Sequence, residues 1–184
     1  MKKTIIIYIV ALVAVAIAAY FYYAGKEYTI TLTESQLQEK LAEKLPLTKT
    51  YFFIFQVTLE NPRVFLTNGR KRVDVGLDVN LNININKEPK PLGGSIDVSG
   101  GVLYVAEKGQ FFLTDPVVEK IKVQGIPEHY SDKANIALSK ALSNYYAEHP
   151  IYTLKSTDIK QAATKLILKD VYIYHKELVI ILGI

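Results

Sequence analysis

The chain has 184 residues, of which 49% are hydrophobic, and it carries 22 Lys and Arg residues against 18 Asp and Glu residues. Its length fits one domain of ordinary size, and a charged fraction of 22% with 11% aromatic residues excludes a wholly disordered chain. Cysteine is absent, which excludes a disulfide scaffold, a thiol nucleophile, Cys-ligated zinc, an iron–sulfur cluster and an acylated N-terminal cysteine.

The net charge of +4 does not indicate a nucleic-acid partner. Lys2, Lys3 and Lys26 flank the hydrophobic N-terminal segment, and without them 19 positive and 18 negative residues remain. A phosphate-binding surface needs an excess of positive charge, and residues 27–184 have almost none. We therefore expect no nucleic-acid partner.

The N-terminal segment predicts a membrane anchor. Residues 5–24 are a run of 20 residues without a charge. A helix of that length, at ~1.5 Å per residue, spans the ~30 Å hydrocarbon core of a bilayer. Because lysines precede the run, the positive-inside rule favours a cytoplasmic N-terminus. We predict a single-pass inner-membrane protein with an anchor over residues 1–26 and one periplasmic domain over residues 27–184. The residues expected at the membrane interface are aromatic: Tyr20, Phe21, Tyr22 and Tyr23.

A cleaved signal peptide is the alternative for the same segment. Ala16-Ile17-Ala18 fits a small-x-small cleavage site. However, the apolar core of a signal peptide is usually ~7–15 residues long. The greater length of this run favours the uncleaved anchor.

The domain opens with patterns for a strand, a helix and another strand. Its first residues alternate apolar side chains with threonines, which is typical of a strand. Thr33 and Gln36 fit a capping box, so a helix is expected to follow. Residues 50–59 alternate again and predict a second strand, with Phe53 and Phe55 on its apolar side.

The longest pattern lies in residues 73–85. Apolar residues occupy every odd position, and polar residues or glycine occupy every even one. Only a strand with one buried and one solvated face has this period. At ~3.3 Å per residue it would extend ~43 Å, far beyond a usual strand, so it has to bend or coil. Pro89 and Pro91 are expected to end it.

The rest of the chain adds strands, one long helix and a closing hairpin. Strands are expected over residues 95–106 and 111–124, the first with a bulge at Gly100-Gly101. An amphipathic helix is predicted from Glu128 or Ser131 to Glu148, and residues 166–182 fit a hairpin. This order predicts an α+β fold in which a long, strongly curved antiparallel sheet wraps one long helix.

Several segments resemble the YceB-like family of Gram-negative envelope lipoproteins, a family of unassigned function. The segments are the opening strand and helix, Gly93-Gly94-Ser95-Ile96-Asp97-Val98, Ile126-Pro127-Glu128 before the long helix, and the final strand over residues 178–183. The resemblance spans residues 27–184. It implies a fold similar to the TULIP (tubular lipid-binding) superfamily, in which a curved sheet and a long helix enclose an apolar channel. Those lipoproteins attach through an acylated cysteine, which this chain lacks, so the membrane helix would replace the lipid.

No catalytic or metal-binding constellation is visible in the sequence. His129, His149 and His175 are scattered and are expected to be solvent-exposed polar residues. Arg70-Lys71-Arg72 is expected to form a solvated hairpin tip, with contact to anionic lipid headgroups as the alternative. We therefore expect no enzyme activity, no cofactor and no metal.

Two functions remain open. One is a membrane-anchored periplasmic protein that binds lipid or another apolar ligand in a sheet-lined channel. The other is a structural or adaptor subunit of an envelope complex, in which the same apolar faces form an ordinary core. Periodicity does not separate the two, because a channel and a core both need inward apolar residues. Under the first hypothesis, the channel is lined by Phe53, Phe55, Val57, Val75, Leu77, Val79, Leu81, Ile83, Leu138 and Leu142.

Overall fold

The computed structural model describes residues 12–18, 27–85, 88–154 and 166–183. Its strands are β1 (Glu27–Thr33), β2 (Leu47–Tyr51), β3 (Phe55–Phe65), β4 (Val73–Ile85), β5 (Glu88–Val105), β6 (Gln110–Val123), β7 (Pro150–Thr153), β8 (Ile167–Tyr174) and β9 (Glu177–Gly183). Its helices are α2 (Glu34–Ala42), the 3-10 turn η1 (Glu128–Tyr130) and α3 (Ser131–Glu148), and residues 12–18 are also helical.

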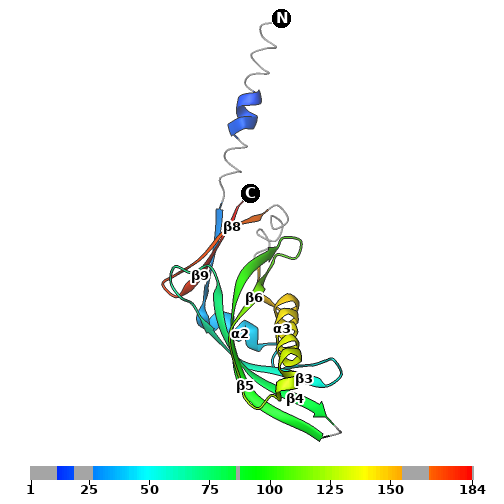
Figure 1. The fold of residues 1–184 in the computed structure, drawn as a ribbon. Coiled ribbons are helices and arrows are strands. Elements are labelled where there is room, and N and C mark those ends of the chain that lie inside the picture. The colour runs from blue at the N-terminus through cyan, green and yellow to red at the C-terminus, as the bar shows by residue number, and fades with distance from the viewer. Residues whose placement is uncertain (1–11, 19–26, 86–87, 155–165, 184) are drawn as a thin grey trace, which may run out of the picture.

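The strands form two antiparallel sheets. A six-stranded sheet has the order β2-β3-β4-β5-β6-β7, and a three-stranded sheet has the order β1-β9-β8. The larger sheet is strongly curved, and α3 lies along its concave side (Figure 1). The predicted combination of a curved antiparallel sheet with one long helix is therefore confirmed, in a chain that is mostly β.

The long alternating strand was predicted correctly. β4 covers Val73–Ile85 and pairs with β3 on one side and with β5 on the other. Its odd-numbered side chains from Val73 to Ile83 are buried, and its even-numbered side chains, apart from Gly76, lie on the more exposed convex face. Alternate side chains of β4 therefore face the inner and the outer side of the sheet, as the sequence pattern indicated.

The strand expected over residues 50–59 is instead two strands. β2 ends at Tyr51, a turn covers residues 52–54, and β3 begins at Phe55. The turn is made by Phe52 and Phe53, whose φ angles are 51° and 63°. The alternation of aromatic residues continues through this turn, which is why the pattern read as one strand.

The prolines that were expected to end a strand lie inside β5. Pro89 pairs with Asn84 and Pro91 with Asn82 of β4. The pairing of β5 with β6 starts only at Gly94, so this part of β5 is an edge of the sheet. A proline is tolerated there because an edge strand has amide positions that need no partner. The bulge predicted at Gly100-Gly101 is confirmed, because the pairing of β5 with β6 shifts register between Ser99 and Gly101.

The opening strand and helix also follow the prediction. The Thr33 side chain accepts from the Gln36 amide over 3.3 Å, and the Gln36 side chain accepts from the Thr33 amide over 3.0 Å. This capping box satisfies two amides that helix geometry leaves without partners. It fixes the start of α2, which buries Leu37 and Leu41.

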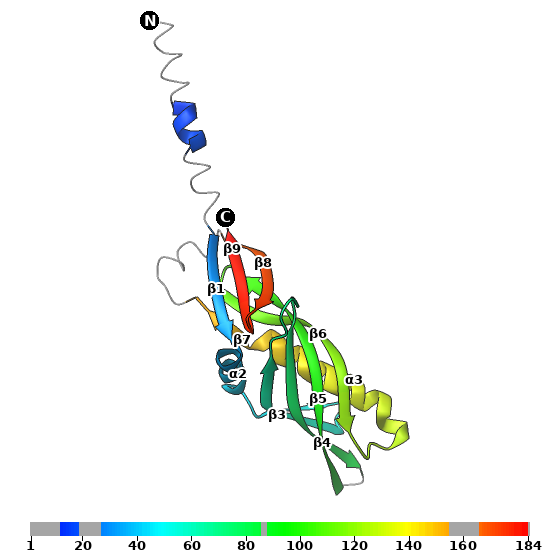
Figure 2. The same cartoon turned by 90° about the vertical axis from the view of Figure 1, so that its left-hand side faces the viewer.

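The small sheet lies at one end of the domain, and the start of α3 lies toward the other (Figure 2). The loop between β3 and β4 joins the two sheets. The Gly69 amide donates to the Ile173 carbonyl and the Ile173 amide donates to the Arg70 carbonyl, both over 3.0 Å. The β8–β9 hairpin is thereby attached to the large sheet.

Within the residues that the structure describes, no helix has both the length and the apolar character needed to cross a membrane. Apart from residues 12–18, the predicted anchor lies outside the described residues, including the interface residues Tyr20, Phe21, Tyr22 and Tyr23. The transmembrane helix stays a prediction.

Candidate functional site

The concave face of the large sheet and the helix that covers it form the candidate site. Nine of the ten residues expected to line a channel lie at this interface, each 1% exposed or less, and all belong to one hydrophobic core. They are Phe55, Val57, Val75, Leu77, Val79, Leu81, Ile83, Leu138 and Leu142. In this conformation the interface is filled by side chains of α3 and the sheet, as a packed core is.

Phe53 does not belong to this interface. Its side chain is 97% exposed, and it lies in the turn between β2 and β3. The expectation that Phe53 lines the interior beside Phe55 is therefore wrong. Phe53 lies in the turn at residues 52–54 and points into solvent, whereas Phe55, the first residue of β3, points inward.

The buried face of α3 combines alanines with larger side chains, which include Tyr145 and Tyr146 near its C-terminal end. Ala134, Ala137 and Ala141 are buried there together with Leu138 and Leu142. Alanine lets a helix approach closely, but it interlocks less with the opposing surface than a longer side chain does. The helix is therefore held mainly by apolar burial.

A stripe of α3 residues four apart faces β2 and the turn after it. Glu148 forms an ion pair with Lys49 at 2.7 Å, and the Asn144 side chain donates to the Tyr51 hydroxyl over 3.2 Å. The Lys49 ammonium holds the pKa of the Glu148 carboxyl below its usual range through this hydrogen bond. The next residue of the stripe, Lys140, lies over the Phe52 ring, with its ammonium 5.0 Å from the ring centroid.

The polar attachments of α3 are confined to its C-terminal part. Besides Asn144 and Glu148, the Tyr145 hydroxyl donates to the carbonyl oxygen of Leu41 in α2. Among the described residues, no side chain from Ser131 to Ser143 forms a hydrogen bond or ion pair with the sheet. The N-terminal part of α3 therefore lies on the sheet through apolar contacts and the single cation–π contact of Lys140.

Two buried polar atoms near the end of α3 have no hydrogen-bond partner within the described part of the chain, Tyr146 Oη and His149 Nε2. The Tyr146 ring packs over Gly100, where a Cβ atom would lie 3.2 Å from Tyr146 Cε2. Burial raises the pKa of the Tyr146 hydroxyl and lowers the pKa of the His149 imidazole. His149 is therefore partly buried and favours its neutral form, in contrast to the exposed residue that was expected, whereas His129 and His175 are exposed.

An open groove lies away from the concave face, between α2 and β7, with a volume of about 500 Å³. Its apolar floor is formed by Leu32, Ile151 and Leu154, which are buried. Its rim is polar, with Glu39 and Glu43 among the residues that line it. This groove is open and has a polar rim, whereas the interface under α3 is apolar, so the groove is a weaker candidate for a long apolar ligand.

The basic cluster at residues 70–72 lies in the loop between β3 and β4, where Arg70 and Lys71 are exposed as expected, but its side chains are paired within the protein. Arg70 Nη1 donates to both carboxylate oxygens of Asp74, over 3.0 and 2.8 Å, and Lys71 forms an ion pair of 2.6 Å with Asp170. Arg72 Nε donates to Ser99 Oγ over 3.1 Å. Each of the three cations is thus bound within the protein.

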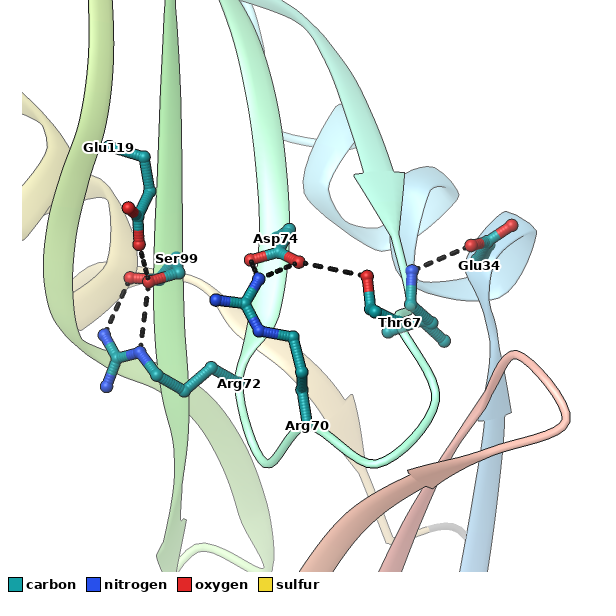
Figure 3. Close-up of polar contacts among 8 residues, drawn as sticks. Glu34, Thr67, Arg70, Arg72, Asp74, Ser99 and Glu119 are labelled. Carbon is teal, nitrogen blue, oxygen red and sulfur yellow. Dashed lines mark hydrogen bonds and ion pairs between the residues drawn. The ribbon is translucent and has the colours of Figure 1, made fainter.

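Figure 3 shows the contacts of Arg70 and Arg72. Ser99, the one polar residue among the fully buried side chains described, donates to Glu119 Oε1 over 2.9 Å and accepts from Arg72. On the other side of the loop, Glu34 of α2 accepts from the Leu66 amide over 2.7 Å. These contacts fix the loop between β3 and β4 to α2 and β5, which is a structural role.

The titratable residues that are described do not form a metal centre. No group of three or more His, Cys, Asp or Glu side chains in the described ranges is placed to hold an ion. The Asp78 carboxylate, for example, is bound by other residues of the sheet region. Hydrogen bonds from Asn61 and Arg63 hold the pKa of the Asp78 carboxyl below its usual range. The apolar interface under α3 therefore stays the best candidate site.

A family model described as "Protein of unknown function (DUF1439)" matches residues 32–177. No curated protein is significantly similar to the chain. Among solved structures, one titled "Crystal structure of lipopolysaccharide binding protein" is similar at 13% identity and a TM-score of 0.36. The match covers 85% of this chain and 39% of that protein, so the chain spans about two fifths of its length. At that TM-score the similarity does not by itself establish a shared fold or a shared ligand.

Proposed function

Since the chain belongs to the DUF1439 family of proteins of unknown function, we propose a function from its own geometry: it binds an apolar ligand, such as an acyl chain, between α3 and the concave sheet. This is a binding function without catalysis. The same interface that is filled by side chains in the closed conformation would take up the ligand when the N-terminal part of α3 moves away from the sheet.

The observation that carries this proposal is the distribution of attachments along α3. Its last turns are tied to β2 and α2 by Asn144, Tyr145 and Glu148. The α3 residues from Ser131 to Ser143, all of them described, have no side-chain hydrogen bond or ion pair to the sheet that would have to break. If the N-terminal part of α3 moves away from the sheet, the main loss is the burial of apolar surface. An apolar ligand in the same place would bury that surface again.

The energetics of an acyl ligand fit this interface. Burial of a methylene group contributes ~0.8 kcal/mol. A ligand in contact with Val79, Leu81 and Leu138 would replace contacts between the helix and the sheet with contacts of the same chemical kind. Water would not replace these contacts, because the inner face has apolar side chains along β3 and β4 and few groups with which water could hydrogen bond.

The proposed cellular setting follows from the sequence. Residues 5–24 would anchor the protein in the inner membrane with its N-terminus in the cytoplasm, and residues 27–184 would lie in the periplasm. A periplasm-specific reporter fused after Ile184 should be active, and the protein should fractionate with the inner membrane at full length. A chain shortened by about 18–24 residues would instead indicate a cleaved signal peptide.

A structural or adaptor role is the second candidate, and the packing of the interface favours it. Nine of the proposed lining residues are 1% exposed or less, so the described conformation has the interior of an ordinary core. In that case the sheet is a scaffold, and the protein acts through its surface on another envelope component.

Ligand binding and the adaptor role are separated by native mass spectrometry of residues 27–184 purified from cells, with a fluorescent fatty acid as a second probe. The described core lies wholly within this segment. We expect co-purified lipid, displaced by the fatty acid.

Two variants on neighbouring residues locate the ligand. Val79→Phe adds a ring to the inner face, and Asn80→Phe adds the same ring to the exposed outer face. Val79→Phe should lose ligand and, because the closed interface is filled, also some stability, typically ~1–3 kcal/mol. Asn80→Phe should keep ligand. Absence of lipid and of probe binding in the unmutated protein would contradict the proposal and leave the adaptor role.

A further inference from the structure

The turn between β2 and β3 places two aromatic residues where a sequence normally places asparagine and glycine. Phe52 and Phe53 have φ angles of 51° and 63°. Side chains with a Cβ atom pay a steric cost in this left-handed region, roughly 1–2 kcal/mol per residue. Tight hairpin turns with two positive φ angles therefore favour Asn-Gly. This turn keeps two phenylalanines despite the strain.

The two side chains are not retained for packing alone. Phe52 makes an edge contact with Phe55, with ring centroids 6.3 Å apart, but it is still 44% exposed. Phe53 is 97% exposed, which is close to the limit for a side chain on a folded protein. A strained turn that presents an almost fully exposed phenylalanine has no explanation in the stability of this domain.

The surroundings of the turn continue the apolar surface. The stripe of α3 that faces β2 runs from Glu148 through Asn144 and Lys140 to Ile136, four residues apart. Glu148, Asn144 and Lys140 contact Lys49, Tyr51 and Phe52 in that order. Ile136 is the next position of the stripe toward the start of α3, and it is 47% exposed.

A cation lies at the base of this surface. The Lys140 ammonium is above the Phe52 ring and has no carboxylate partner among the described residues. The carboxylates on the same stripe, Asp132 and Glu148, are each eight residues from Lys140, or about 12 Å along the axis. Protruding aromatic side chains with a lysine behind them have the chemistry of a membrane interface, where rings enter the acyl region and the ammonium contacts phosphates.

We propose that Phe52, Phe53, Ile136 and Lys140 form a tip that inserts into the surface of a phospholipid bilayer. A projecting turn fits a bilayer better than a flat partner, because lipid deforms around a convex apolar tip. The tip lies beside the start of α3, away from the small sheet that contains β1 (Figures 1 and 2). The proposal stands on its own, whether or not a ligand binds under α3.

The absence of tryptophan from the chain allows a direct test. Full-length protein carrying Phe53→Trp is reconstituted into nanodiscs and mixed with vesicles of phosphatidylcholine and phosphatidylglycerol that contain brominated acyl chains. We expect a blue shift of the emission and quenching by the brominated lipid. Tyr174→Trp, at another exposed hairpin end, is the control and should show neither change.

A second variant separates membrane binding from folding. Phe53→Gly relieves the positive φ, so its melting temperature should equal or exceed that of the unmutated protein. Its flotation with acceptor vesicles should fall by about tenfold or more, as expected for the loss of one buried phenylalanine. Phe53→Trp emission that vesicles leave unchanged, or undiminished flotation of a folded Phe53→Gly variant, would overturn the proposal.

Discussion

The Asn144 side chain of α3 donates a hydrogen bond to the Tyr51 hydroxyl at the end of β2, over 3.2 Å. This contact marks a boundary along the helix. On its C-terminal side, Tyr145 and Glu148 add polar attachments to Leu41 and Lys49. On its N-terminal side, the described residues back to Ser131 meet the sheet through apolar contacts. The same helix thus has polar attachments at one end and is held along the rest by apolar burial and the Lys140–Phe52 cation–π contact.

Two adjacent tyrosines in α3 predict opposite effects of the same substitution. The Tyr145 hydroxyl satisfies the carbonyl of Leu41, which lies in the last turn of α2 and lacks a helical partner. Tyr145→Phe leaves that carbonyl unpaired and should destabilise the domain by about 1–3 kcal/mol. Tyr146 Oη is buried without a partner among the described residues, so Tyr146→Phe should be neutral or stabilising.

Urea unfolding of the two variants and the unmutated protein measures this difference. The two substitutions remove the same atom from neighbouring, equally buried positions, so each is the control for the other. Equal losses of stability would show that the hydrogen bond to Leu41 does not fix α3 to α2.

The Gly93-Gly94 pair predicts a second contrast. A Cβ atom on Gly94 would lie 2.3 Å from the Lys122 carbonyl oxygen of β6, which no side-chain movement relieves. Gly94→Ala should therefore force β5 and β6 apart and cost at least about 1–3 kcal/mol. A Cβ atom on Gly93 would meet nothing closer than Asn80 Oδ1 at 3.8 Å, so Gly93→Ala should be neutral or stabilise by up to about 1 kcal/mol.

The melting temperatures of Gly93→Ala, Gly94→Ala and the unmutated protein test this contrast. If Gly94→Ala melts at the temperature of the unmutated protein, then the close approach of β5 and β6 at this position does not exist in solution.

His149 predicts a pH dependence that is separate from that of the carboxylates. Burial lowers the pKa of its imidazole below the ordinary value of 6.5. As pH falls through 6.5, the unfolded chain takes up this proton before the folded one does, so stability should decline until the folded pKa is reached. Asp78, Glu148 and Asp170 also have lowered pKa values, but their contributions are lost only at lower pH, as pH falls through their folded values.

The measurement is the free energy of unfolding between about pH 7.5 and 5, for the unmutated protein and for His149→Gln. The decline with falling pH should be smaller in the variant. An identical decline would mean that the imidazole is solvated in the folded state.

Local periodicity accounts for what the sequence predicted well. The alternation in Val73–Ile85 and the apolar stripe of Ser131–Glu148 are properties of single segments, so they identify β4 and α3 without knowledge of their partners. The Thr33–Gln36 capping box is local for the same reason. These elements are sufficient to predict a curved sheet around one helix.

Features that depend on distant residues escaped the sequence. The turn at Phe52 and Phe53 interrupts an alternation that continues through it, and only the pairing of β2 with β3 reveals it. Lys71 is bound by Asp170, 99 residues away, so no local pattern shows that this cation is occupied. Whether Val79 and Leu81 line a channel or a core depends on how closely α3 approaches the sheet. The alternation of apolar and polar residues in β4 carries no information on that distance.

The opening of α3 is the central claim, and hydrogen exchange measured by mass spectrometry tests it most directly. In the full-length protein in detergent, amides of residues 135–141 should exchange faster than those of Tyr145–Glu148, and added fatty acid should slow exchange in the first group only. Starting at residue 135 avoids the first helical amides, which lack partners in any helix. Equal protection along the whole of α3, unchanged by fatty acid, would contradict an opening helix and the ligand site beneath it.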